Sequence, residues 1–136
     1  MNIANTNVNG PQPYLIAEIG VNYFDIADKR DISPLKAAKE MVSEAAEAGV
    51  DAVKFQSYTA DQLASKHSPA YWNTDEEATE SQYELFEQYD DFGAEEFEEI
   101  AAWTDANYDV DFMSTPFDFH AADYLEDLVP AYKIAS

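Results

Sequence analysis

Residues 33–56, SPLKAAKEMVSEAAEAGVDAVKFQ, place a helical pattern directly before a short apolar strand, AVKFQ. Ser33 followed by Pro34 is a helix-start signal, because a Ser side chain caps free backbone N–H groups and Pro fits the first turn. Apolar residues then recur at helical spacing as far as Gly49, which predicts a helix that buries one face. A helix that leads at once into a strand is typical of parallel α/β proteins.

The same alternation continues on both sides of this stretch. An apolar run at 14–19 (YLIAEI) predicts an earlier strand, followed by a polar loop. Further elements are predicted as helices at 81–89, 94–107 and 119–128 and strands at 111–114 and 132–135. Parallel strands need right-handed crossovers and covering helices. The sequence therefore predicts an α/β fold, the parallel (β/α) half of a TIM-type (β/α)₈ barrel, with strands 1–4 in one incomplete domain over residues 1–136.

Composition excludes several classes of function. The 136 residues include 28 Asp and Glu against 7 Lys and Arg, no Cys, and 46% hydrophobic residues, for a net charge of −21. The apolar content is enough for a packed core, whereas the charge disfavours nucleic acid and anionic membranes as partners. No apolar run approaches the roughly 18 residues that span a bilayer. We therefore expect a cytoplasmic protein without nucleic-acid or membrane partners.

Polar residues follow or interrupt each predicted strand near its carboxyl end, where parallel α/β folds bind their ligands. They are Glu18 and Asn22 after the first strand, Lys54 and Gln56 on the second, Ser114 and Thr115 on the third, and Lys133 and Ser136 on the fourth. A Lys inside an apolar strand is costly unless its ammonium is paired or reaches a ligand. Two converging ammonium groups beside hydroxyls would suit a phosphate or a carboxylate.

Two interpretations of these residues remain open on spacing alone. Lys54 and Lys133 either hold an anionic ligand or pair with Glu18 and other carboxylates as structural ion pairs. Glu18 is either a general acid/base, an acceptor for a substrate hydroxyl, or the partner of Lys54. His67 and His120 lack companions at metal-ligand spacing, so no metal site is predicted in this chain.

Four blocks in this order, AEIGVN (17–22), AVKFQ (52–56), STPFD (114–118) and YKIAS (132–136), resemble the amino-terminal half of the N-acetylneuraminate (sialic acid) synthase family. The resemblance implies a (β/α)₈ barrel that condenses phosphoenolpyruvate with an N-acetylated aminosugar aldehyde. The product would be a 2-keto sugar acid, with release of phosphate. It also implies a divalent metal, Mn or Mg, and a homodimer for the complete enzyme.

The resemblance assigns roles residue by residue. It implies that phosphoenolpyruvate is held by Lys54, Thr115, Lys133, Ser136 and a loop residue, Asn73. It implies that Glu18 faces the sugar and the reaction centre as the catalytic residue, with Asn22 and Tyr23 on a sugar-side loop.

The sequence also departs from the family pattern. The family continues Asn-His-Asn-Gly after its first strand, whereas Asn22 is followed here by Tyr23-Phe24-Asp25-Ile26, which puts the identity of the acceptor in doubt. The metal-binding His pair and the antifreeze-like C-terminal domain of the family have no counterpart in these residues. We therefore expect this chain alone to be incomplete and inactive. A non-catalytic half-barrel subunit or scaffold completed by a second chain, or another phosphoenolpyruvate or aldol-type barrel, are the alternatives.

The excess of acidic residues, combined with few Lys, predicts a halophilic source. Carboxylates at this density repel one another at low ionic strength and destabilise the compact state. The circular-dichroism signal of helix should therefore rise as KCl is raised from zero to about 2 M, where charges are screened within a few ångströms. Glycerol at equal osmolarity serves as the control. Full folding without salt would contradict a halophilic adaptation.

Overall fold

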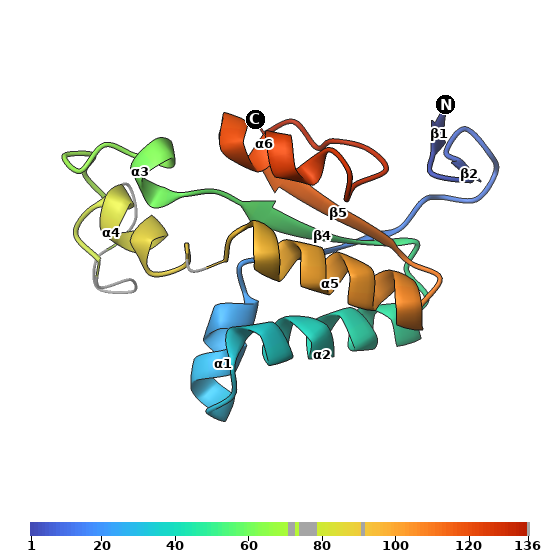
Figure 1. Cartoon of the computed structure of the whole chain (residues 1–136), viewed down its shortest axis with the longest axis horizontal. Coiled ribbons are helices and arrows are strands. Elements are labelled where there is room, and N and C mark those ends of the chain that lie inside the picture. The colour runs from blue at the N-terminus through green and yellow to red at the C-terminus, as the bar shows by residue number, and fades with distance from the viewer. Residues whose placement is uncertain (71–72, 74–78, 91, 136) are drawn as a thin grey trace.

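The centre of the protein is a parallel sheet of three strands, β3 (Ile16–Gly20), β4 (Ala52–Ser57) and β5 (Asp111–Pro116), in the order β3-β4-β5 (Figure 1). This computed structural model describes residues 1–70, 73, 79–90 and 92–135. The three strands and their parallel pairing confirm the α/β prediction. β4 is the central strand, so its backbone is hydrogen-bonded to a neighbour on both sides.

Two long helices, α2 (Pro34–Glu47) and α5 (Ala94–Asn107), run side by side along one face of the sheet (Figure 1). The start of α2 follows the predicted chemistry, because the Ser33 hydroxyl accepts a hydrogen bond from the Lys36 N–H at 3.2 Å. After α2 the chain turns through Gly49 at φ +84°, a left-handed conformation that glycine adopts without strain. The helix therefore ends where the sequence predicts, directly before β4.

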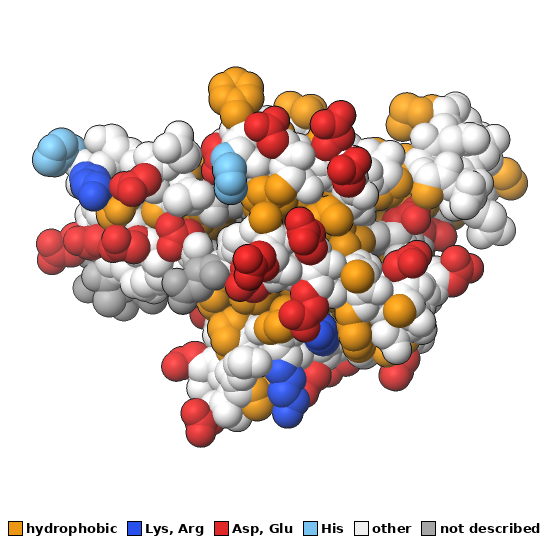
Figure 2. Space-filling model, viewed as in Figure 1, with side chains coloured by type: hydrophobic (Ala, Val, Ile, Leu, Met, Phe, Trp, Pro, Cys, Tyr) orange, Lys and Arg blue, Asp and Glu red, His pale blue; other side chains and the backbone are white. Residues whose placement is uncertain are grey.

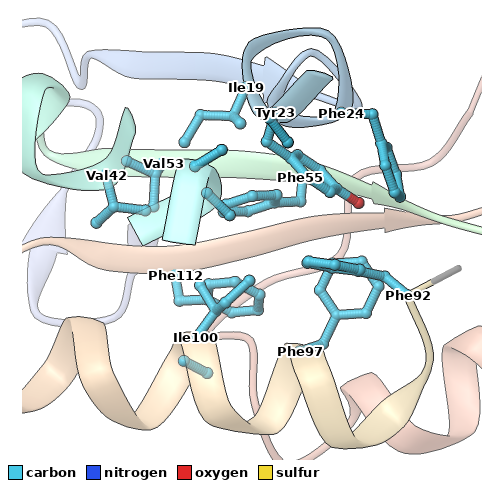
Figure 3. Close-up of a cluster of buried hydrophobic side chains, with 14 of the residues drawn as sticks. Ile19, Tyr23, Phe24, Val42, Val53, Phe55, Phe92, Phe97, Ile100 and Phe112 are labelled. Atoms are coloured by element: carbon cyan, nitrogen blue, oxygen red, sulfur yellow. The ribbon is translucent and has the colours of Figure 1, made fainter. Parts of the chain in front are cut away.

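The core lies between this face of the sheet and the helices. Figure 3 shows Val53 of β4 beside Val42 of α2, and Phe55 of β4 facing Phe112 of β5 and Phe97 of α5. The rings of Phe55 and Phe112 stack with centroids 5.6 Å apart, and Phe97 meets Phe55 edge-on at 6.1 Å. Alternate residues of each strand thus supply the core, as the two-residue period of a β-strand requires.

The segment after β3 is helical, which corrects the prediction of a polar loop there. Helix α1 (Tyr23–Arg30) buries Tyr23, Phe24 and Ala27 against the core. The Tyr23 ring lies 4.5 Å from that of Phe24 and 4.6 Å from that of Phe92, measured between centroids. The apolar contacts of three residues on a short polar helix therefore decide its conformation, and the contact with Phe92 cannot be read from local sequence.

The carboxyl edge of the sheet is followed by three short helices. They are α3 (Ala60–Leu63), α4 (Gln82–Glu87) and α6 (Phe119–Leu125), of which α4 and α6 are shorter than predicted. Two two-residue strands that the sequence did not predict, β1 (Asn2–Ile3) and β2 (Thr6–Asn7), pair antiparallel near the amino terminus. The larger elements of the prediction are correct, and the differences lie in short segments.

The predicted fourth strand at 132–135 is wrong for the residues that the structure describes. This segment is irregular and is not paired with β5. The Tyr132 hydroxyl donates to the Ala122 carbonyl at 2.9 Å, which ties the segment to α6, and Ile134 is 76% exposed. A strand is defined by its partner, so an apolar run without ladder hydrogen bonds does not become one.

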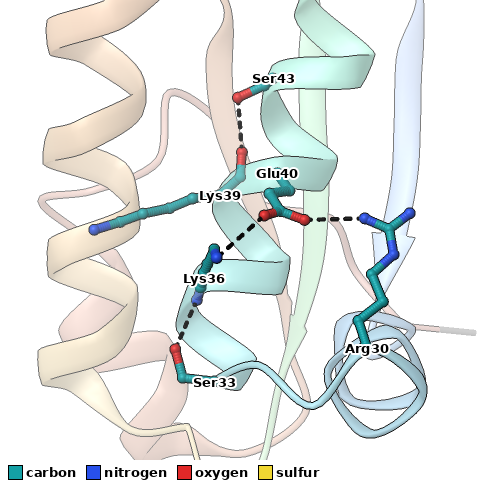
Figure 4. Close-up of polar contacts among 6 residues, drawn as sticks. All are labelled: Arg30, Ser33, Lys36, Lys39, Glu40 and Ser43. Carbon is teal, nitrogen blue, oxygen red and sulfur yellow. Dashed lines mark hydrogen bonds and ion pairs between the residues drawn. The ribbon is translucent and has the colours of Figure 1, made fainter.

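Acidic side chains are spread over the visible surface, with few basic ones among them (Figure 2). Several of the basic residues join helices. Arg30 of α1 pairs with Glu40 of α2 at 3.0 Å (Figure 4). Lys39 of α2 also pairs with Glu99 of α5 at 2.6 Å. Among the described residues no helix is both long and apolar enough to cross a membrane.

The core makes a direct stability prediction with an internal control. Phe97→Ala should lower the free energy of unfolding by about 3–5 kcal/mol, because it empties a site that is 1% exposed. Phe119→Ala removes the same ring from a position that is 92% exposed and should change stability by about 0.5 kcal/mol or less. Urea denaturation of both variants measures the difference. Equal losses would contradict the position of the core.

Candidate functional site

The sheet face opposite the helices carries the polar residues predicted for the site. In β4, Val53 and Phe55 enter the core, so Lys54 and Gln56 point to the other face. The register places Glu18 beside Lys54, and Thr115 beside Gln56. Residues that are neighbours in register in a parallel sheet point to the same face, so Glu18, Lys54 and Thr115 share one face near its carboxyl end.

Lys54 and Glu18 form an ion pair on this face. The Lys54 ammonium donates a hydrogen bond to Oε2 of Glu18. Lys54 as a whole is 9% exposed, whereas the Glu18 side chain is 51% exposed. The structural-pair interpretation of Lys54 is therefore realised here with Glu18 as the partner, and the two members of the pair differ strongly in their access to water.

Gly20 and Gln56 complete the surroundings of the pair. The ladder between β3 and β4 shifts between Glu18 and Gly20, and Gly20 adopts φ +59°. A Cβ on Gly20 would lie 3.5 Å from Nε2 of Gln56 and 3.9 Å from Oε1 of Glu18. Both polar side chains thus lie against the turn that ends β3, where the positive φ favours glycine.

Ser114 does not join this face, although it is a polar residue at a strand end. It lies on the helix side with Ser57, and the two hydroxyl oxygens are 2.7 Å apart with both residues fully buried. Burial raises the pKa of the Tyr124 hydroxyl on α6, and the nearby Ser57 hydroxyl acts in the opposite direction. The buried contact between Ser57 and Ser114 joins the ends of β4 and β5, which is a structural role.

Two aspartates fix the loops at the carboxyl edge, and residue types alone did not single them out. Asp118 caps α6 by accepting from the Ala121 N–H at 2.7 Å, and its other oxygen accepts from the Thr59 N–H at 3.1 Å. Asp90 accepts from the Ala60 N–H at 2.9 Å. Burial, with Asp90 nearby, also raises the pKa of the Tyr58 hydroxyl. A hollow of about 460 Å³ beside Asp118 is lined by the residues Gln62, Pro116, Phe117, Asp118, Phe119, His120 and Ala122.

The remaining predicted residues lie apart from this face or outside the description. Lys133 is exposed in the irregular segment, where its ammonium donates to the Ile134 carbonyl, so it is not a strand-borne partner of Lys54. Asn73 is exposed, and Ser136 lies outside the described residues. Asn22 is exposed at the start of α1. Of the predicted site residues that the structure describes, Glu18, Lys54 and Thr115 therefore share one face of the sheet.

Tyr23 corrects the prediction of a sugar-side loop residue. It is 1% exposed inside α1 and packs in the aromatic core. Its side chain follows the apolar face of an amphipathic helix, so its position next to Asn22 in sequence does not place it at the same surface.

Comparison with known proteins identifies the family. The model of the NeuB family matches residues 41–136.

This chain belongs to the NeuB family.

Relatives agree with this assignment. The N,N'-diacetyllegionaminic acid synthase of Legionella pneumophila is 33% identical over 98% of this chain and 37% of its own length. The crystal structure of the N-acetylneuraminic acid (sialic acid) synthetase of Leptospira borgpetersenii, in complex with citrate, matches 98% of this chain and 40% of its own, with a TM-score of 0.73 and 27% identity. The spore coat polysaccharide biosynthesis protein SpsE of Bacillus subtilis matches with a TM-score of 0.66 and 33% identity, over all of this chain and 33% of its own.

The comparisons show the class of fold and the share of its relatives' length that this chain covers. These neighbours have a TIM-barrel-type fold, and the three parallel strands with their helices are part of it. This NeuB-family chain spans about a third of the length of the curated relatives that it matches. Among the described residues, no group of three or more His, Asp or Glu side chains could hold a metal ion.

The unequal burial of the ion pair predicts unequal effects of its two halves on stability. Glu18→Gln should lower the free energy of unfolding by about 1–3 kcal/mol, because it leaves a buried ammonium without its counter-charge. Lys54→Met should change it by about 1 kcal/mol or less, because Glu18 can turn to water and Met fills the space. Urea denaturation compares the two variants. A larger loss for Lys54→Met would contradict the assignment of Lys54 as the desolvated partner.

Proposed function

We propose that this chain contributes the donor-binding part of a sugar-acid synthase that condenses phosphoenolpyruvate with an N-acetylated aminosugar aldehyde. The observation that carries the proposal is the buried Lys54 on the central parallel strand, on the same face as Thr115, which lies near the carboxyl end of β5. Membership of the NeuB family supports the same reaction class. A barrel of this type places its ligands at that end of the strands.

Charge supports an anionic donor. The protein carries a formal charge of −21, so its outer surface repels small anions. A buried ammonium is a local exception that favours a phosphate or a carboxylate, and the hydroxyl of Thr115 offers a further donor on the same face. The citrate in the Leptospira synthetase is an organic polyanion bound by a relative, which agrees with an anion-binding member of this family.

The relatives indicate the class of acceptor. The N,N'-diacetyllegionaminic acid synthase and the N-acetylneuraminic acid synthetase are both named for N-acetylated sugar acids, which supports an N-acetylated aminosugar aldehyde as the acceptor. Glu18 is half-exposed on the same face as Lys54, so we assign it to the sugar side of the reaction centre. Asn22, which follows the end of β3, is exposed and would border the acceptor.

The reaction forms one carbon–carbon bond and exchanges the phosphate oxygen at C2 for a water oxygen. C3 of the enolpyruvate attacks the aldehyde carbon, whose oxygen takes up a proton. Water adds at C2 and gives up a proton, and the C2–O bond to phosphate breaks as phosphate leaves. In this reaction Lys54 and Thr115 would hold the donor and offset its charge, and Glu18 would accept a hydrogen bond from the acceptor. We also assign Lys133, Ser136 and Asn73 to the donor, on the family resemblance alone.

Other features of the complete protein are likewise proposals. A homodimer, a halophilic source and a cytoplasmic location follow from the family resemblance or from composition. The divalent Mn or Mg expected for the complete enzyme has no ligand group among the described residues, so no step is assigned to it here.

Calorimetric titration with phosphoenolpyruvate tests the donor site. We expect the purified chain to bind phosphoenolpyruvate without releasing phosphate, and Lys54→Met to weaken binding about tenfold or more, because a charge-assisted hydrogen bond is lost. Lys29→Met removes the same charge from an exposed position on α1 and is the matched control. Equal binding by both variants, or none by any protein, would overturn the donor site and favour a non-catalytic subunit. Phosphate release at a rate typical of the family would overturn the predicted incompleteness.

A further inference from the structure

We propose that Glu18 acts as a built-in competitor for the anion site: its carboxylate occupies the Lys54 ammonium until a dianionic ligand displaces it. This inference rests on the proposed donor site and adds a role for Glu18 that selects between anions. The contact that carries it is the hydrogen bond from the Lys54 ammonium to Oε2 of Glu18.

Burial of Lys54 makes its positive charge costly in free energy unless the charge is paired. Lys54 has 11% of its side chain exposed, and an ammonium at such a site needs a partner because its hydration is largely lost. Among the described residues, Glu18 is the carboxylate paired with it. The Glu18 carboxylate therefore neutralises the Lys54 charge on the central strand.

The two side chains of the pair differ in their exposure to water. About half of the Glu18 side chain is exposed, so its carboxylate can turn to water at little cost, whereas Lys54 cannot. Its β-strand ends in the turn at Gly20, where φ is +59°. An arriving anion therefore replaces Glu18 on a fixed ammonium, and binding is an exchange of one anion for another.

The charge of an anion decides whether it can displace the Glu18 carboxylate from Lys54. A carboxylate held on the neighbouring strand acts at a high effective concentration, so a dissolved monovalent anion such as chloride competes poorly with it. A dianion gains about twice the Coulomb energy at the same distance and adds hydrogen bonds to its other oxygens. Glu18 thus lowers the affinity for every external anion and excludes the monovalent ones.

The test compares Glu18→Gln with wild type in calorimetric titrations with phosphoenolpyruvate and with inorganic phosphate. If the pair is formed about 90% of the time, removing the competitor should tighten both dissociation constants about tenfold. Glu47→Gln, which removes the same charge from an exposed position at the end of α2, should leave both unchanged. The double variant with Lys54→Met and Glu18→Gln should not show the tenfold tightening of the dissociation constants.

A second measurement tests selectivity at fixed ionic strength by replacing gluconate with chloride. Chloride should change the wild-type affinity for phosphoenolpyruvate by less than about twofold, and weaken that of Glu18→Gln severalfold, because its ammonium is open to monovalent anions. If Glu18→Gln unfolds, Glu18→Asp is used, whose shorter side chain should give an intermediate gain in affinity.

The outcomes separate the two proposals. Binding that depends on Lys54 but is unchanged or weakened by Glu18→Gln would overturn the competitor role and leave the donor site intact. Binding gained by Glu18→Gln with the predicted chloride sensitivity would support the competitor role. No binding of either anion by any variant would overturn both.

Discussion

The alternation of side chains along the central strand β4 is the constraint on which the rest of the structure depends. Because successive residues point to opposite faces, Val53 and Phe55 must enter the core whenever Lys54 and Gln56 leave it. A shift of register by one residue would bury the ammonium under α5 and expose two apolar side chains. Pairing on both sides of β4 prevents that shift, so the same interaction builds the core and presents the candidate site.

The ion pair between Lys54 and Glu18 links folding to the proposed function. A buried positive charge lowers the stability of the fold unless a carboxylate neutralises it. Glu18 does this for Lys54 from the neighbouring strand. In the proposed donor site, the ion pair that stabilises the protein would also compete with a ligand for Lys54. Stability and affinity would therefore be opposed at Glu18.

The helices contribute mostly through position. α2 and α5 cover the apolar face, and α3, α4 and α6 follow or precede the strands at the carboxyl edge, where Asp90 and Asp118 join backbone segments that are distant in sequence. α1 replaces the loop that the family resemblance led us to expect next to Asn22, and it turns Tyr23 into a core residue. The surface beside Asn22 is therefore helical, whereas the face that carries Glu18, Lys54 and Thr115 is formed by the strands themselves.

The sequence by itself determined the three paired strands, the helices α2 and α5, and the presence of Glu18, Lys54 and Thr115 near strand ends, because local periodicity and capping specify these elements. Tertiary structure alone decided that Ser114 faces Ser57 and that Tyr23 packs on Phe92, since both depend on contacts between distant segments. It also decided that Lys54 is paired with Glu18 while Lys133 lies in an unpaired segment. Apolar alternation gives a segment the capacity to form a strand, but only a neighbouring backbone supplies the hydrogen bonds that make it one.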